Sequence, residues 1–342
     1  EIIVTGQRAS LARSLELKRD TIGVVGWKYL SSSEWAGERP SFQVSAHLID
    51  VLGRIVGGSG ALIEATPCLM SPRDGLRSVV DVHQIAAGEW GAARASAAVW
   101  RIVSGIRDGD DEFTAAARMG YAGEELSAHV MLASSPPGTP VVGLRSPRGR
   151  RLSRGDGVTT AVSYWGGLSS RAGLLDVGND DFLQVAKAYF AGLLSWYEAI
   201  DVGVAGGEVE AAVREALARG NLRPALNPGH LVGHDEWLHT PVRPGAEDTI
   251  RSGMPFQVDV IPTPVPLGQA LNAEDAVTIA DADLRRELAR LYPDTAARIE
   301  ARRQFVAREI GVDLKDSILP LSNTPLYVPP FWLAPEQALV AT

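Results

Sequence analysis

The stretch LNPGHLVGHDEWLH, residues 226–239, holds three of the six histidines of the chain and two acids within fourteen residues. Histidines and carboxylates are the side chains that most often bind transition metals or carry protons in enzymes. Three interpretations of this stretch are open: a metal site, an acid–base site, or the remnant of one. The rest of the chain has to decide among them.

Composition describes a globular protein of more than one core. At 342 residues the chain exceeds the usual size of a single core, so one large domain and part of a second are expected. The formal charge of −8 and the pI near 5.4 argue against a nucleic-acid partner. The one basic run, SPRGRRLSRG at 146–155, is interpreted as a solvated loop.

Cys68 is the only cysteine, which excludes intrachain disulfides and cysteine-based metal sites. A single thiol is compatible with a reducing compartment, so a cytoplasmic location is expected. No apolar run reaches the length of a membrane span, and no membrane partner is expected. The chain begins with Glu1, so a signal peptide cannot be judged.

Hydrophobic periodicity predicts two zones. Residues 1–72 correspond to a partial α/β domain, with a strand at 21–27 and a helix at 42–55. Residues 73–342 form the large domain, which opens with a long alanine-rich helix at 79–106. Further helices and strands alternate irregularly, with some strands adjacent in sequence. This order favours an α+β fold over a doubly wound sheet.

Five short motifs in a fixed order carry a family resemblance. They are IGVVGWKYL (22–30), RGDGV (154–158) with YWGGLSSRAG (164–173), GHLVGHDEWLH (229–239), SGMPFQVDV (252–260) and NAEDAVTIAD (272–281). Together they resemble the creatinase/aminopeptidase P family. The resemblance implies the pita-bread fold, in which two similar α/β halves curve an antiparallel sheet around a central site. Members of this family commonly form homodimers, so a homodimer is expected.

Metallopeptidases of that family hold two metal ions with two aspartates, one histidine and two glutamates. The position of the first aspartate, a few residues after the Gly-Asp turn, is Ala161 here. The second aspartate normally precedes an arginine, and the residues before Arg171 place Leu168 or a serine there. Both aspartates are therefore absent.

The other three positions keep ligand-type side chains. His230 matches the family histidine, Asp259 stands in the place of the first glutamate, and Glu274 matches the last one. Two neighbouring divalent ions need several shared carboxylates to offset their repulsion, so a dinuclear centre is not expected. A single ion on these three residues is the alternative to a metal-free pocket of the kind that creatinase has.

A metal-free pocket would give these residues other roles. Asp259 and Glu274 would bind a cationic group or adjust each other's pKa, and His230 or His239 would carry protons. The catalytic histidine of creatinase has no counterpart, because Leu144 or Arg145 stands near its position.

Four more residues complete the expected site. Trp165 and Trp237 are candidates for lining a substrate slot, and packing is the other interpretation of both. His234 either belongs to the site or pairs with Asp235. Arg171 either holds a substrate carboxylate or braces the pocket through Asp259.

The sequence therefore predicts a metal-independent, creatinase-like hydrolase or lyase that acts on a small polar substrate, nitrogen-containing compounds included. Its catalytic residues would be His230, His239, Asp259 and Glu274, with no cofactor. Two alternatives stay open: an Xaa-Pro metallopeptidase with a reduced metal site, and a non-enzymatic peptidase-like binding module.

Overall fold

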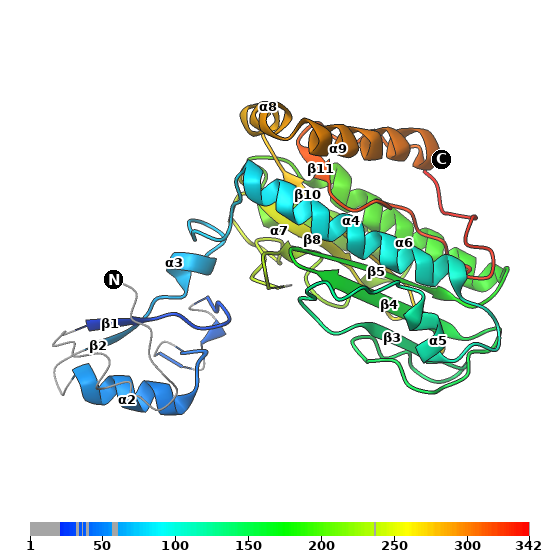
Figure 1. Ribbon diagram of the computed structural model, residues 1–342, viewed down its shortest axis with the longest axis horizontal. Helices are drawn as coiled ribbons and strands as arrows, with labels where there is room; N and C mark the ends of the chain where they lie inside the picture. The colour runs from blue at the N-terminus through cyan, green and yellow to red at the C-terminus, as the bar shows by residue number, and fades with distance from the viewer. Residues whose placement is uncertain are drawn as a thin grey trace. The chain divides into compact units, whose positions relative to one another are not determined.

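The computed structural model describes residues 21–31, 34–35, 37–38, 41–56, 61–235 and 237–341, and the chain divides into two compact units, 1–78 and 79–342. In the first unit, two parallel strands pair and a helix connects them, as a parallel pair requires. Its elements are β1 (Thr21–Val24), α2 (Ala46–Val56), β2 (Ala61–Glu64) and the short helix α3 (Pro67–Met70) (Figure 1).

A seven-stranded sheet forms the centre of the second unit as described (Figure 1). Its strand order is β3-β4-β5-β10-β8-β7, with β11 beside β10, and the pairs are antiparallel. The strands are β3 (Met131–Ser135), β4 (Gly157–Tyr164), β5 (Gly167–Leu174), β7 (His230–Leu231), β8 (Met254–Val260), β10 (Asn272–Ile279) and β11 (Ile318–Pro320). The short strands β6 (Arg223–Pro224) and β9 (Pro262–Thr263) form a separate pair.

Helices pack on this sheet. They are α4 (Val82–Gly105), α5 (Glu112–Ala117), α6 (Asp180–Ala199), α7 (Gly206–Ala218), α8 (Ala282–Leu291) and α9 (Pro293–Phe305), which ends in a π-helical turn (Val306–Ile310). The α4 helix, predicted at 79–106, begins after Asp81, whose side chain accepts from the Gln84 N–H in a capping box. None of the helices in the described ranges combines the length and apolarity needed to cross a bilayer.

Strand alternation separates two faces of the sheet. Val158 and Val162 of β4 belong to the core with α4 and α5, and Phe256 and Val258 of β8 belong to the core with α6 and α7. Because side chains alternate along a strand, the residues between these point to the opposite face. Asp259 on β8 lies on that opposite face, which is called the site face below.

A buried ion-pair cluster joins α4 to α9. The Glu89 side chain, 1% exposed, accepts from Arg298 Nε and Nη2 at 2.9 and 2.7 Å and from Arg302 Nη2 at 2.5 Å. Burial by itself raises the pKa of Glu89, but the hydrogen bonds and charges of the two arginines outweigh it and lower this pKa below its ordinary value. Residues far apart in sequence are thus locked together by charge.

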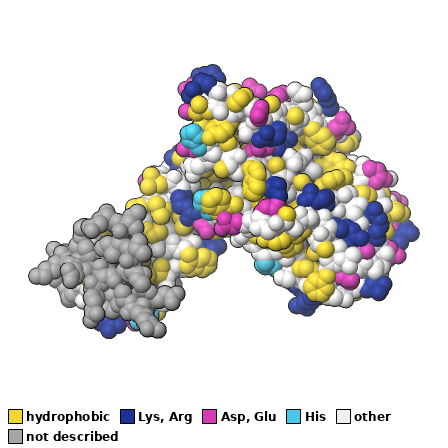
Figure 2. All heavy atoms as spheres, viewed as in Figure 1, with side chains coloured by type: hydrophobic (Ala, Val, Ile, Leu, Met, Phe, Trp, Pro, Cys, Tyr) yellow, Lys and Arg dark blue, Asp and Glu magenta, His cyan; other side chains and the backbone are white. Residues whose placement is uncertain are grey.

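The basic run at 146–155 is partly neutralised by acids. Arg150 makes a two-pronged pair with the buried Asp156, and Arg154 pairs with Asp176 at 2.8 Å. Figure 2 shows Lys and Arg side chains interspersed with Asp and Glu on the visible face of the second unit. The arginines of this run therefore hold a loop in place through ion pairs and do not form a continuous basic surface.

Candidate active site

One row of residues crosses four neighbouring strands at the centre of the site face. The register pairs Ala161 with Ser170, Ser170 with Glu274, and Glu274 with Asp259. Directly opposed residues of antiparallel strands point to the same face, about 4.5–5.5 Å apart. The sheet thus places these four side chains side by side, with the two acids at one end.

The backbone conformation of Pro228 and Gly229, just before His230, is restricted by its neighbours. Gly229 has φ +102°, and a Cβ there would lie 3.0 Å from Trp196 Nε1, so a glycine fits where a side chain would be strained. Trp196 Nε1 donates to the Pro228 carbonyl at 2.8 Å, and Thr240 Oγ1 donates to the Gly229 carbonyl at 2.6 Å. These contacts hold the backbone at the start of β7 and so orient the side chain of His230.

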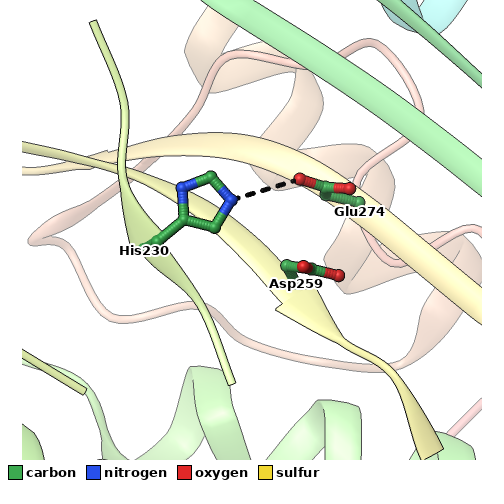
Figure 3. Close-up of side chains that lie close together, drawn as sticks. All are labelled: His230, Asp259 and Glu274. Carbon is green, nitrogen blue, oxygen red and sulfur yellow. Dashed lines mark ion pairs between the residues drawn. The ribbon is translucent and has the colours of Figure 1, made fainter. Parts of the chain in front are cut away.

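His230, Asp259 and Glu274 meet on the site face (Figure 3). One potential ligand atom of each lies within 4.8 Å of the others, and His230 Nε2 is 3.6 Å from Glu274 Oε1. His230 and Glu274 are buried, and Asp259 is half-buried. Three of the eight residues that the sequence analysis placed in the site are therefore neighbours in space.

The ring of His230 has a defined orientation. Its Nδ1 lies 3.2 Å from the Leu231 carbonyl, which can only accept, so Nδ1 carries the hydrogen. In the neutral ring, Nε2 then carries a lone pair that faces the Glu274 carboxylate. Two acceptors are held together favourably only if a proton or a cation lies with them. The geometry suits either proton transfer or binding of a cation.

The residues fit one metal ion and do not fit two. Ala161 has no ligand atom, and the register places Ser170 rather than Leu168 in the row beside Glu274. Leu168 instead opposes Ser163, two residues further along the hairpin. A bridged pair of ions would lack two carboxylates. One histidine and two carboxylates nevertheless form a plausible set for a single ion.

Two tryptophans contact the three histidines of the 230–239 stretch. The centroid of the Trp237 ring is 6.3 Å from that of His230 and 6.2 Å from that of His239. Trp165, in the turn between β4 and β5, stacks on His234 with centroids 3.9 Å apart. This second contact joins the tip of one hairpin to the loop that follows β7, at the other end of the strand order.

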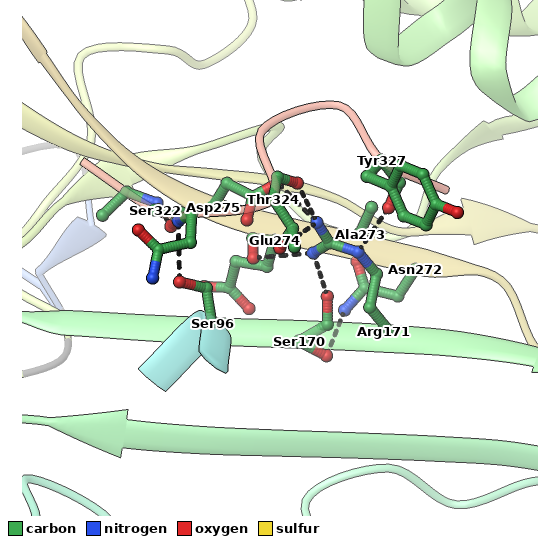
Figure 4. A network of polar contacts seen from close by, with 12 residues as sticks. Ser96, Ser170, Arg171, Asn272, Ala273, Glu274, Asp275, Ser322, Thr324 and Tyr327 are labelled. Atoms are coloured by element: carbon green, nitrogen blue, oxygen red, sulfur yellow. Dashed lines mark hydrogen bonds and ion pairs between the residues drawn. The ribbon is translucent and has the colours of Figure 1, made fainter. Parts of the chain in front are cut away.

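Arg171 braces the sheet through a different acid from the one expected (Figure 4). It pairs in register with Thr160 and Ala273, so it points away from the site face, and it bonds Asp275 Oδ2 at 2.9 Å rather than Asp259. Its other acceptors are the carbonyls of Tyr327, Ser170, Thr324 and Glu274 and the Thr324 hydroxyl. Alternation explains the difference, because Asp275 and Glu274 lie on opposite faces of β10.

Two site-face amides were absent from the sequence-based site. Gln257 is two residues before Asp259 and opposes His230, and Asn272 is two residues before Glu274. The spacing was visible in QVD and NAE, because residues i and i+2 of a strand share a face. On the helix side of β10, Tyr189 accepts from the Ala273 N–H at 2.7 Å. Burial raises the pKa of Tyr189, so it stays neutral.

Comparison with known proteins supports the fold. No description of a protein family matches the sequence, and no curated protein matches it. Among solved structures, the prolidase from Pyrococcus horikoshii has a TM-score of 0.61 at 17% identity, over 76% of this chain and 71% of its own. The prolidase from Pyrococcus furiosus has a TM-score of 0.61 at 18% identity, over 80% and 77%.

The X-Pro aminopeptidase from Thermotoga maritima is also similar, with a TM-score of 0.56 at 17% identity over 79% of this chain and 74% of its own. Sequence identities this low show a shared fold and do not show a shared activity. Sheet topology, the convergence of the triad and these structures agree, and the chain has the pita-bread fold that its resemblance to the creatinase/aminopeptidase P family implied.

Proposed function

We propose that this protein is a hydrolase that cleaves a carbon–nitrogen bond in a small, nitrogen-containing substrate by acid–base chemistry at His230, Asp259 and Glu274. The supporting observation is the convergence of one histidine with two carboxylates on a fold shared with a prolidase and an X-Pro aminopeptidase. The Ala161 and Ser170 positions argue against chemistry that needs two bridged ions.

Each residue has a role in this proposal. Nδ1–H of His230 donates to the Leu231 carbonyl, and Nε2 faces Glu274. It takes a proton from the attacking water and returns it to the departing nitrogen as the carbon–nitrogen bond breaks. Asp259 and Glu274 hold positive charge on the substrate and stabilise the protonated imidazole. His239, whose ring centroid lies 6.2 Å from that of Trp237, would be a second proton carrier.

A single metal ion is the second candidate, and one observation favours it. Ligating histidines usually donate their other ring N–H to a carbonyl or carboxylate, as His230 does to Leu231. His230, Asp259 and Glu274 would hold the ion, which would polarise the substrate carbonyl. The protein would then be an Xaa-Pro peptidase with a reduced metal site.

Turnover of small amides, amidines and Xaa-Pro dipeptides by the purified chain tests the proposal. His230→Ala should abolish turnover, whereas His129→Ala, which alters an exposed histidine, should leave it unchanged. Asp259→Asn and Glu274→Gln should each weaken it, because each loses a charge while keeping its shape. Metal analysis and chelation separate the candidates: activity on Xaa-Pro dipeptides that disappears with a stoichiometric ion would support the peptidase instead. Full activity in His230→Ala would exclude both.

A further inference from the structure

Gln257 presents a buried acceptor on the site face. Its side chain is fully buried, and its Nε2 donates to the Leu168 carbonyl at 2.9 Å. A carbonyl oxygen only accepts, so the amide orientation is fixed with Oε1 turned away from Leu168. Within the described residues this Oε1 has no hydrogen-bond partner. A buried oxygen of this kind is costly to leave without a donor, because it has lost its bonds to water.

Asn272 repeats the arrangement on β10. Ser170 Oγ donates to the Thr160 carbonyl at 3.0 Å and therefore accepts from Asn272 Nδ2 at 3.1 Å. The amide is thereby oriented, and its Oδ1 is a second buried oxygen with no partner among the residues described. Both amides thus donate to β5 and offer their oxygens elsewhere.

The two amides flank the acid row. Gln257 opposes Ala276 and lies on one side of the Asp259–Glu274 pair, while Asn272 lies on the other side. They are four residues apart in the strand direction, roughly 13 Å at 3.3–3.4 Å per residue. Ligand oxygens of one ion lie within about 2.6 Å of it, so a polyatomic ligand suits this spacing better than a shared ion.

We propose that Gln257 and Asn272 are specificity-determining residues, which accept N–H hydrogen bonds from a cationic substrate such as a protonated amine or amidine. The proposal rests on the proposed function for the location of the site. Around the triad, the two carboxylates and two amide oxygens are all acceptors, so the matching ligand carries positive charge and several N–H donors. Charge alone would be satisfied by Asp259 and Glu274; the amides add a requirement for N–H groups.

Binding of two matched cations to the full chain tests this by calorimetry. Acetamidinium carries N–H donors, whereas tetramethylammonium carries the same charge with none. Wild-type protein should bind acetamidinium and discriminate against tetramethylammonium. Gln257→Met keeps length and removes the oxygen, so it should bind acetamidinium about tenfold to a hundredfold more weakly. Gln304→Met, which alters an exposed glutamine on α9, should bind as the wild type does.

Equal binding of the two cations by the wild type, no binding of acetamidinium, or unchanged affinity in Gln257→Met would overturn the proposal. A thermal melt shows whether Gln257→Met is folded. If it is not, Gln257→Leu, which also removes the amide oxygen, gives the same readout, with weaker binding expected and unchanged binding decisive against the proposal. The hydrolase proposal is tested separately, by turnover in His230→Ala, so failure of one is distinguishable from failure of the other.

Discussion

Glu89→Gln should destabilise the second unit strongly, because it removes the negative charge between Arg298 and Arg302 while keeping the size of the side chain. Arg302 is 6% exposed and loses its ionic partner, and the new amide N–H₂ faces guanidinium donors. Removing one member of a buried pair costs about 3–5 kcal/mol. At about 2–4 °C per kcal/mol for a unit of this size, the melting temperature should fall by about 6–20 °C.

The matched control is Glu215→Gln on α7. Glu215 pairs with Arg219 one turn later, and both side chains are about three-quarters exposed, at 74% and 75%. Exposed pairs of this kind contribute about 0.3–0.5 kcal/mol, so the control should melt within about 2 °C of the wild type.

Acid should remove the difference between wild type and Glu89→Gln. The folded-state pKa of Glu89 lies below its ordinary value of 4.5, so its stabilisation is complete above the unfolded-state pKa and is lost as pH falls through the folded-state pKa. Urea unfolding at pH 7 and at stepwise lower pH, followed by circular dichroism, measures both effects. A loss at pH 7 no larger than that of Glu215→Gln would refute the reasoning, as would a gap between wild type and variant that stays constant below pH 4.5.

Four further predictions follow from the sheet and the site. Arg171→Met should lower the free energy of unfolding in urea by about 3–5 kcal/mol, because Asp275 stays buried without its cation. Gly229→Ala should lower it by about 1–3 kcal/mol, because its φ is positive; an unchanged melt would contradict this. Ala161→Asp with Ser170→Asp should raise the metal bound per chain, measured by mass spectrometry, more than Ala161→Asp with Leu168→Asp. Light scattering at micromolar concentration should give the mass of a homodimer, and a monomer mass would reject it.

Sequence reasoning reached the triad because each member belongs to a short local motif. It could not fix which residue stands beside Glu274, since strand register depends on the two-residue turn at Trp165 and Gly166, and the choice between Leu168 and a serine stayed open. Arg171 bonds Asp275 and not Asp259, and alternation along β10 predicts this only once β10 is known to lie beside β5. This pairing joins segments about a hundred residues apart.

Longer-range contacts carry no local signal at all. The hydrogen bonds from Arg298 to Glu89 join residues 209 positions apart, and the sequence of neither helix predicts which residue the other supplies. The interpretation of 146–155 as solvated was incomplete for the same reason, because Arg150 and Arg154 are paired with acids that the fold brings to them.

The separation of the sheet into two faces has a consequence for how such a protein can change. Ala161 and Ser170 lie on the site face, whereas the residues beside them, such as Val162 and Arg171, hold the helices and the C-terminal chain. Exchanging a carboxylate for a small neutral side chain there removes repulsion among buried acids and leaves the packed side untouched. Substitutions at these two positions can therefore change the chemistry of the site face while the contacts that stabilise the fold are kept.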